Sequence, residues 1–425
     1  MPIASRSLRP LWFCLFFVMV SGAARAQAPP GRITLDQAIQ LALAHNPSYQ
    51  AARTAIVQSQ DEEITANLRP NPVLTLDSLF VPVFQPDQMT SSNLDNFSEF
   101  DAGVSYLFER GKKRQHRLAA ARDQTAVTRS QVADARRTLT YNVAQQFTAV
   151  LLAESTLRFA ERDLDSFQKT VALSSSRYKA GYISEGDYLK IKLQLLQFQT
   201  DVSSARLARA QALIGLRQLL GYQSVPANFD VIGSLSFQPV HGIVEQYQLD
   251  ALKDRPDLRA AVQGVTAAQG QYALARADGK QDVNTTLDYT HVSGLNNLSF
   301  TVNIPLPIFD RNQGEIARTS SAIITAQDSE TAAREQVLTD VSNAFETVRS
   351  NAQIVKLYES GFLNEAKQSR DISAYAYQRG GTSLLDLLDA ERSYRATELG
   401  YLQALANYQL ALEQLREAVG TRRLP

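Results

Sequence analysis

The sequence predicts a membrane β-barrel that continues into a long α-helical coiled-coil barrel, with four strands contributed by each chain. Three observations carry this prediction. Residues recur at a fixed offset, so one unit is built twice and the chain has an internal two-fold repeat. Four segments alternate between apolar and polar residues, which is typical of strands. Two further stretches of about 65 residues contain no proline and indicate very long helices.

The repeat has an offset of 199 residues and holds from position 178 to position 221 without an insertion. We therefore divide the chain into an N-terminal segment (1–26), a first repeat (27–222) and a second repeat (223–425). The matching pairs are Tyr178 and Tyr377, Gly181 and Gly380, Ser184 and Ser383, Asp187 and Asp386, Leu189 and Leu388, Leu216 and Leu415, and Gly221 and Gly420.

The N-terminal segment has the pattern of a secretory signal peptide. Arg6 and Arg9 precede an apolar run of ten residues, and Ala24-Arg25-Ala26 follows it. The run is too short to cross a bilayer as a mature helix. We expect cleavage after Ala26, which would remove Cys14, the only cysteine of the chain.

Composition excludes several classes of function. The chain has 43 basic and 43 acidic residues, whereas nucleic-acid binders usually carry a basic excess. With four His and one Cys there is no cluster for a structural zinc site or a disulfide framework. No motif of a catalytic nucleophile, phosphate loop or metal site occurs. We predict no enzyme, no catalytic residue, no resident metal or cofactor, and no nucleic-acid partner.

Each repeat begins with two helices. The first pair covers 33–68 and breaks at Asn46-Pro47, and Thr34 with Gln37 has the spacing of a capping box. The second pair covers 249–277 and breaks at Arg255-Pro256.

A β-hairpin follows each helix pair, at about 72–108 and about 283–306. The first hairpin has a long polar loop (82–98) and the second a short one (293–297). Strands of about nine to eleven residues suit a tilted transmembrane strand with one apolar face. A soluble, half-buried sheet gives the same alternation, so the strand pattern alone leaves both readings open.

Long helices fill the rest of each repeat, from about 111 to 176 and from about 311 to 375. Each ends in a glycine-containing tip, near 181–187 and 380–386, and a second helix returns. In the last helix the apolar steps of three and four predict a coiled-coil seam of Leu405, Tyr408, Leu412, Leu415 and Val419.

Four strands cannot close a membrane barrel, because the smallest such barrels have eight. An open edge in lipid leaves backbone amides without partners, at a cost of several kcal/mol each. Twelve strands from three chains is the simplest closure.

With its repeat, four strands and long helical hairpins, the chain resembles the TolC-like outer membrane efflux family, and within it the heavy-metal and cation (CzcC/CusC-like) branch. The resemblance covers nearly all of the mature chain, from Ile33 to Gly420. Asn46-Pro47 matches the N-terminal helix pair, and the segment 304–314 (IPLPIFDRNQG) is similar to the strand-to-helix junction of the metal-efflux branch.

The resemblance implies a homotrimer in the outer membrane with a large periplasmic duct and a gate at the hairpin tips. It places Asp386 and Asp389, together with Asp187 and Tyr377, at that gate. Acidic rings favour cations. From the residues alone, the two acids on the returning helix are better explained as solvated charges near a helix N-terminus, and it is the resemblance that favours the gate. In some members of the family an arginine latches the closed state, but that position is Thr382 here, and Arg379, three residues earlier, is a candidate substitute.

The resemblance also implies partners. The tips, at Gly181, Ser184, Gly380 and Ser383, would contact a periplasmic adaptor, which joins the duct to an inner-membrane transporter of the RND type. The expected cargo is metal cations or small toxic compounds. The basic run 112–117 is expected to contact anionic headgroups of the outer membrane lipid. Two alternatives stay open: a periplasmic adaptor or coiled-coil scaffold, and a duct for type I protein secretion.

Overall fold

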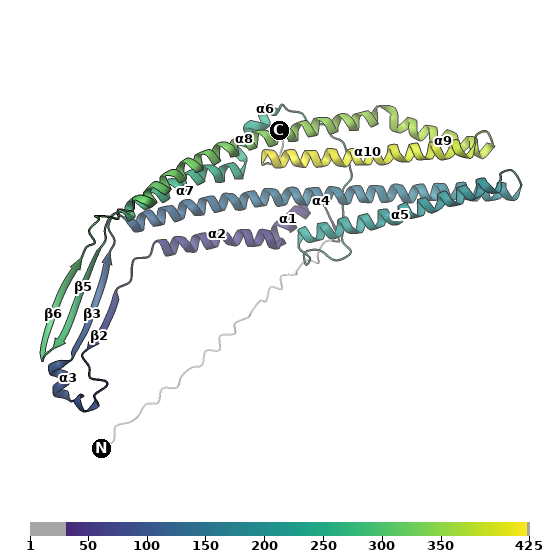
Figure 1. Cartoon of the computed structure of the whole chain (residues 1–425). Helices are drawn as coiled ribbons and strands as arrows, with labels where there is room; N and C mark the ends of the chain where they lie inside the picture. The colour runs from purple at the N-terminus through teal and green to yellow at the C-terminus, as the bar shows by residue number, and fades with distance from the viewer. Residues whose placement is uncertain (1–30, 423–425) are drawn as a thin grey trace, which may run out of the picture.

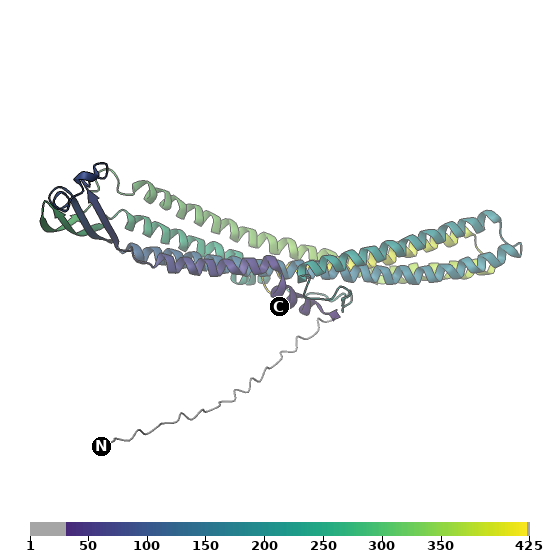
Figure 2. The same cartoon turned by 90° about the horizontal axis from the view of Figure 1, so that it is seen from below.

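The computed structural model describes residues 31–422, so the predicted signal peptide lies outside the described residues. The chain forms an elongated molecule with a sheet at one end and two helical tips at the other (Figure 1). Seen from below, the helices again run lengthwise between these two ends (Figure 2). This arrangement separates the sheet from the tips by the full length of the helices.

The first half runs from a helix pair through a hairpin to two long helices. Thr34 caps the first helix in a complete capping box with Gln37, and Asn46 caps the second, ahead of Pro47. Its elements are β1 (Arg32–Ile33), α1 (Leu35–His45), α2 (Pro47–Ala66), β2 (Val73–Leu79), η1 (Pro86–Gln88), α3 (Ser91–Phe97), β3 (Glu99–Phe108), α4 (Lys113–Lys179) and α5 (Glu185–Leu220).

The second half repeats this order after a linker that contains the short strand β4 (Asp230–Val231), which pairs in parallel with β1. Its elements are α6 (Val244–Asp254), α7 (Pro256–Asp278), β5 (Val283–Val292), β6 (Leu295–Asn303), α8 (Gln313–Leu357), the π-helix η2 (Tyr358–Phe362), α9 (Leu363–Arg379) and α10 (Leu384–Val419).

The prediction of one continuous long helix in the second half is wrong. The stretch expected from 311 to 375 is interrupted by the π-helix, in which Gly361 has φ 137° and ψ −29°. Only glycine adopts such a conformation readily, so the helix bends here. Tyr401 of α10 supports the bend by donating a hydrogen bond of 2.9 Å to Glu359 Oε1. The first half has no counterpart, because α4 is one helix of 67 residues.

Two smaller differences concern loops and helix ends. The segment 82–98, expected as a polar loop, contains η1 and the helix α3, whose N-cap is Thr90. The helix α6 begins at Val244, five residues before the predicted start. The second hairpin closes more tightly than expected, because only Ser293 and Gly294 separate β5 from β6, and both have positive φ.

The sheet has the antiparallel order β2-β3-β5-β6, so its central pair joins the two halves of the chain. The strands β2 and β6 are therefore its free edges within one chain. Away from the sheet, the helices pack around hydrophobic cores, and each half of the chain has one at the equivalent place. The predicted seam of α10 is confirmed, because Leu405, Tyr408, Leu415 and Val419 are buried and Leu412 packs against them.

Within residues 31–422, no helix is both long and apolar enough to cross a membrane.

Candidate functional site

Both hairpin tips lie at the end of the molecule opposite the sheet (Figure 1). Gly181 and Gly380 turn the chain with φ of 77° and 78°. Ser184 and Ser383 then cap the returning helices by accepting hydrogen bonds from the third residue of each helix, Asp187 N at 3.1 Å and Asp386 N at 3.2 Å. The repeat thus builds the same cap twice.

The second tip holds its acid more firmly than the first. The hydroxyls of Ser383 and Thr382 donate to Asp386 Oδ2 at 2.7 and 2.8 Å, and the backbone N–H of Ser383 donates at 3.2 Å. These hydrogen bonds lower the pKa of Asp386 below its usual value. Thr382, which stands where some members of the resembled family have an arginine, therefore helps to fix the Asp386 carboxylate directly.

Asp389 lies one turn further along α10 on the same face as Asp386. Its side chain is exposed, and its carboxylate lies 3.9 Å from Arg392. Asp187, at the first tip, lies 3.7 Å from Lys190. Asp187 also accepts a hydrogen bond of 2.9 Å from the Ser184 hydroxyl. The candidate site therefore combines two acids bonded to their capping serines with Asp389, which pairs with an arginine of its own helix.

Tyr377 joins the two hairpins just behind the tips. It is 4% exposed, and its hydroxyl lies 3.4 Å from Ser174 Oγ of α4. Arg177 of α4 donates a hydrogen bond of 2.6 Å to the Tyr377 carbonyl and lies 5.2 Å from the centre of its ring. A cavity of about 480 Å³ between the tips is lined by Arg177, Asp187, Tyr377, Thr382 and Ser383 together with hydrophobic neighbours.

Sequence reasoning missed Arg177. It considered Arg379 as a replacement for the family's latch, but Arg379 lies over the ring of Tyr375 on its own helix, 5.2 Å from the ring centre. Arg177 has no counterpart in the repeat, since the matching position is Ala376. That asymmetry, an arginine in the first half where the second half has alanine, is the signal that would have found it.

At the other end of the molecule the sheet has one apolar and one polar face. Two rows of residues paired across all four strands are wholly apolar: Leu74, Val104, Leu287 and Phe300, and Leu76, Ala102, Tyr289 and Leu298. The next row on this face is mixed, because Phe100 is paired there with Ser78 and His291. The opposite face carries polar rows such as Asp77, Asp101, Thr290 and Asn297. The large apolar side chains are exposed within the single chain. The sheet thus presents an apolar surface that a soluble protein would bury.

The basic run at the junction of sheet and helix is partly engaged within the chain. Lys113 forms an ion pair of 2.8 Å with Asp282, and Arg117 forms one with Glu109. Arg114 donates to the side chain of Asn67. These contacts fix the start of α4 to the ends of the strands.

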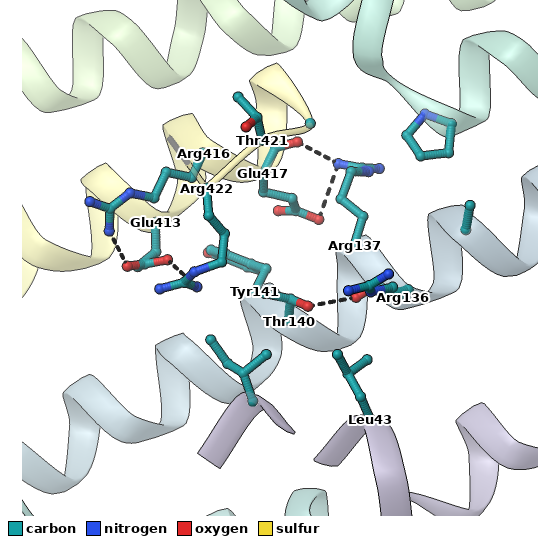
Figure 3. A pocket seen from close by; sticks show the side chains of 14 residues that line it. Leu43, Arg136, Arg137, Thr140, Tyr141, Glu413, Arg416, Glu417, Thr421 and Arg422 are labelled. Atoms are coloured by element: carbon teal, nitrogen blue, oxygen red, sulfur yellow. Dashed lines mark hydrogen bonds and ion pairs between the residues drawn. The ribbon is translucent and has the colours of Figure 1, made fainter. Parts of the chain in front are cut away.

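A pocket of about 380 Å³ lies where α1, α4 and the end of α10 meet (Figure 3). Arg137 of α4 pairs with the Glu417 carboxylate at 3.4 Å and donates to its carbonyl at 2.9 Å. Arg422 pairs with Glu413 at 3.3 Å. Arg422 also lies 3.6 Å from Asp36 of the first half. Because Arg137 and Arg422 both form ion pairs across the two halves, we assign the pocket to a structural joint between the repeats.

Among residues 31–422, no group of three or more His, Cys, Asp or Glu side chains is placed to hold a metal ion.

Two long helical hairpins joined to a sheet with an exposed apolar face define an elongated membrane-associated protein of the channel type. The profile described as outer membrane efflux protein matches residues 38–222 and 249–421, which is most of the chain in two successive segments. The chain belongs to the outer membrane efflux protein family, as the resemblance in its sequence predicted, and it is an outer membrane protein with a large periplasmic helical part.

Curated relatives and solved structures agree with this assignment. The chain is 26% identical to the cobalt-zinc-cadmium resistance protein CzcC of Cupriavidus metallidurans, over 90% of this chain and 88% of that protein. It is 25% identical to the pyoverdine export outer membrane protein OpmQ of Pseudomonas aeruginosa, over 92% and 84%.

A crystal structure of CusC has the same fold, with a TM-score of 0.75 at 22% identity over 91% of this chain and 92% of that chain. The open state of the MtrE outer membrane channel of Neisseria gonorrhoeae also gives a TM-score of 0.75, at 20% identity over 91% and 89%. The predicted fold class is confirmed by these likenesses, and the family is one of transport channels.

Proposed function

We propose that three copies of this chain form the exit duct of a tripartite efflux pump that exports metal cations or small toxic compounds. Each chain, built from the repeats 27–222 and 223–425, supplies four strands and two hairpins. A periplasmic adaptor and an inner-membrane transporter of the RND type complete the pump. The observation that carries the proposal is the four-stranded sheet, which is apolar on one face and open at both edges.

The two free edges of the sheet support a trimer. In one chain β2 and β6 are free edges, and free edges in lipid are costly. Pairing β6 of one copy with β2 of the next removes both edges, and three copies give about twelve strands, an even number within the range of outer membrane barrels. The apolar rows then face lipid and the polar rows face the lumen.

The hairpin tips support a gate at the periplasmic end. We assign Asp386, Asp389, Asp187 and Tyr377 to it, and we assign adaptor contact to the turns at Gly181, Ser184, Gly380 and Ser383. Three copies would place the two acids of α10 around one axis, where carboxylates attract cations and repel one another.

The relatives support cations as cargo. CzcC is named for cobalt, zinc and cadmium resistance and CusC as a cation efflux protein, whereas OpmQ is named for pyoverdine export. Small organic compounds are therefore the second candidate cargo.

The duct is tested first by its assembly. The full chain, extracted from outer membranes in mild detergent, should migrate as a trimer on an unheated gel and as a monomer after boiling. Reconstituted into planar bilayers, the trimer should give single-channel conductance. A soluble monomer without conductance would contradict the duct and favour an adaptor or a scaffold.

The partner assignment is tested by photo-crosslinking. A crosslinker placed at Ser184 or Ser383 should capture a periplasmic adaptor, whereas one placed at the exposed Gln168, further from the tips, should not. Capture from Gln168 alone, or of a secreted protein in transit, would argue against the assigned tips.

A further inference from the structure

A cluster of charged side chains is buried between the two long hairpins, behind the tips, and its Glu391 lies two residues beyond the proposed gate acid Asp389 on α10. Asp163 of α4 is 5% exposed and Glu391 of α10 is 7% exposed. Both lie in the helical part where α10 packs on α4. Charged residues are rarely buried to this extent unless they are paired, so the cluster calls for an explanation.

Arg395 of α10 ties the second hairpin to the first. Its Nε lies 2.8 Å from Asp163 Oδ2, and a second nitrogen forms an ion pair with Asp201 of α5. Its guanidinium also lies 4.3 Å from the ring centre of Phe198 of α5. One arginine therefore holds two acids and an aromatic ring of the other hairpin.

The remaining helix, α9, contributes a second arginine. Arg370 lies 4.5 Å from the ring centre of Tyr394 and forms an ion pair of 2.8 Å with its neighbour Asp371. The ring of Tyr394 in turn contacts Phe159 of α4 edge-on, with centres 5.9 Å apart. All four helices of the two hairpins meet at the cluster.

Acids outnumber cations in this site. The charged and titratable groups that face it are, by helix, Arg162 and Asp163 from α4, Asp201 from α5, Arg370 and Asp371 from α9, and Glu391, Tyr394, Arg395 and Glu398 from α10. Glu391 Oε2 is buried and accepts no hydrogen bond from another described residue. An ionised carboxylate in that position is costly, and a bound proton removes the cost.

The raised pKa values of the two buried acids decide how the stability of this contact changes with pH. Burial raises the pKa of Glu391 to about 7 and that of Asp163 to about 6, against the opposing effect of the two arginines. A buried acid with a raised pKa stabilises the packed state most when it is protonated. Stability of this contact is therefore present in mild acid and is lost as the pH rises through about 7.

We propose that Glu391 and Asp163 form, with Arg395, a proton-dependent latch that holds the two hairpins together and loosens as the periplasmic pH rises. Loss of the proton leaves buried negative charge in excess of the arginines, which favours entry of water and separation of α10 from α4. The inference rests on the proposed duct, because separation of the hairpins would widen its periplasmic end.

The test measures single-channel conductance of the full-length trimer between about pH 6 and about pH 8. The wild-type conductance should rise across this range. Glu391→Gln, which keeps the shape of a protonated glutamate, should lose the rise and stay at the low value. The matched control is Glu365→Gln, an exposed glutamate of α9 that should keep the wild-type profile. Asp386 does not interfere, because its pKa is lowered.

A second measurement separates failure of the latch from failure of the duct. Spin labels at the exposed positions Gln168 of α4 and Ser393 of α10 report the distance between the hairpins in one chain, in trimers diluted with unlabelled copies. The distance should lengthen with rising pH in wild type and stay constant in Glu391→Gln. A pH-dependent distance without any channel would overturn the duct and keep the latch.

A flat wild-type profile in both measurements, or a full pH response in Glu391→Gln, would overturn the latch. If Glu391→Gln fails to assemble, Asp163→Asn takes its place and should reduce the rise in conductance in the same way.

Discussion

At the scale of single residues, the two acids of α10 differ in how tightly they are held. Asp386 accepts hydrogen bonds from three donors of the preceding turn, whereas Asp389 has only Arg392 at 3.9 Å. Both carboxylates are exposed and place negative charge at the proposed entrance, where it attracts cations.

Replacing Asp386 and Asp389 together by alanine should raise single-channel conductance and weaken block by multivalent cations, because the carboxylates that bind the blocker are gone. The Asp386 change also removes one of the two hydrogen bonds of the capping box at the start of α10. Glu185→Ala, in the first turn of α5, is the control and should leave the block unchanged. Unaltered conductance in the double variant would count against the gate.

A second residue-scale prediction concerns Arg255, which is 4% exposed. It pairs with Asp257 at 2.5 Å and Asp340 at 2.8 Å and so joins α7 to α8. Arg255→Met should destabilise the folded chain by about 2 kcal/mol, less than for a fully buried network because both acids are partly exposed. Thermal unfolding followed by circular dichroism measures this. The exposed Arg259→Met should have little effect, and equal melting of the two variants would contradict the prediction.

Single residues were predictable where the deciding contact is local. Thr34 and Gln37 form the capping box that their spacing predicts, because both partners lie within one turn. Asp163 and Glu391 gave no such signal. They occupy positions that are polar in many long helices, and their burial depends on how four helices from both halves pack together.

At the scale of elements, the joint at Gly361 distinguishes the second hairpin from the first. The periodicity of the sequence does not reveal it, because a single glycine is tolerated inside a helix. Strands were more predictable, since a period of two is distinct from a helical period and the observed register keeps it across all four strands.

Gly361→Ala should lower thermal stability, because φ of 137° costs an L-residue about 1–3 kcal/mol. Gly264→Ala supplies the contrast. That glycine lies inside α7, and no neighbouring group comes within 4 Å of the place that an alanine Cβ would take, so alanine should stabilise the chain by about 0.5–1 kcal/mol. Circular dichroism melts of both variants test this, and a gain in stability at both positions would show that the joint carries no strain.

At the scale of the whole molecule, the repeat made the architecture predictable, because one unit read twice gives the element order of both halves. The number of copies could not be read in the same way. It depends on contacts between chains, and the sequence bears on it only through the four strands that must be closed.

The orientation of the sheet gives a whole-molecule prediction. Phe300→Lys places a charge on the apolar face and should cost about 2–4 kcal/mol near the middle of a bilayer, whereas Ser299→Lys, next in the chain but on the polar face, should be tolerated. The yield of heat-modifiable trimer in outer membranes measures both. A greater loss for Ser299→Lys would mean that the faces are reversed.

The joint in the second hairpin has a mechanical consequence. α4 is an unbroken helix of 67 residues, about 100 Å long, whereas α8 and α9, which pack on α10, form a stretch of similar length with a bend at η2. When a continuous helix and an interrupted helix belong to the same wall of the proposed duct, bending is concentrated at the π-helix. The helices can then keep their length and their packing while the distance between their tips changes.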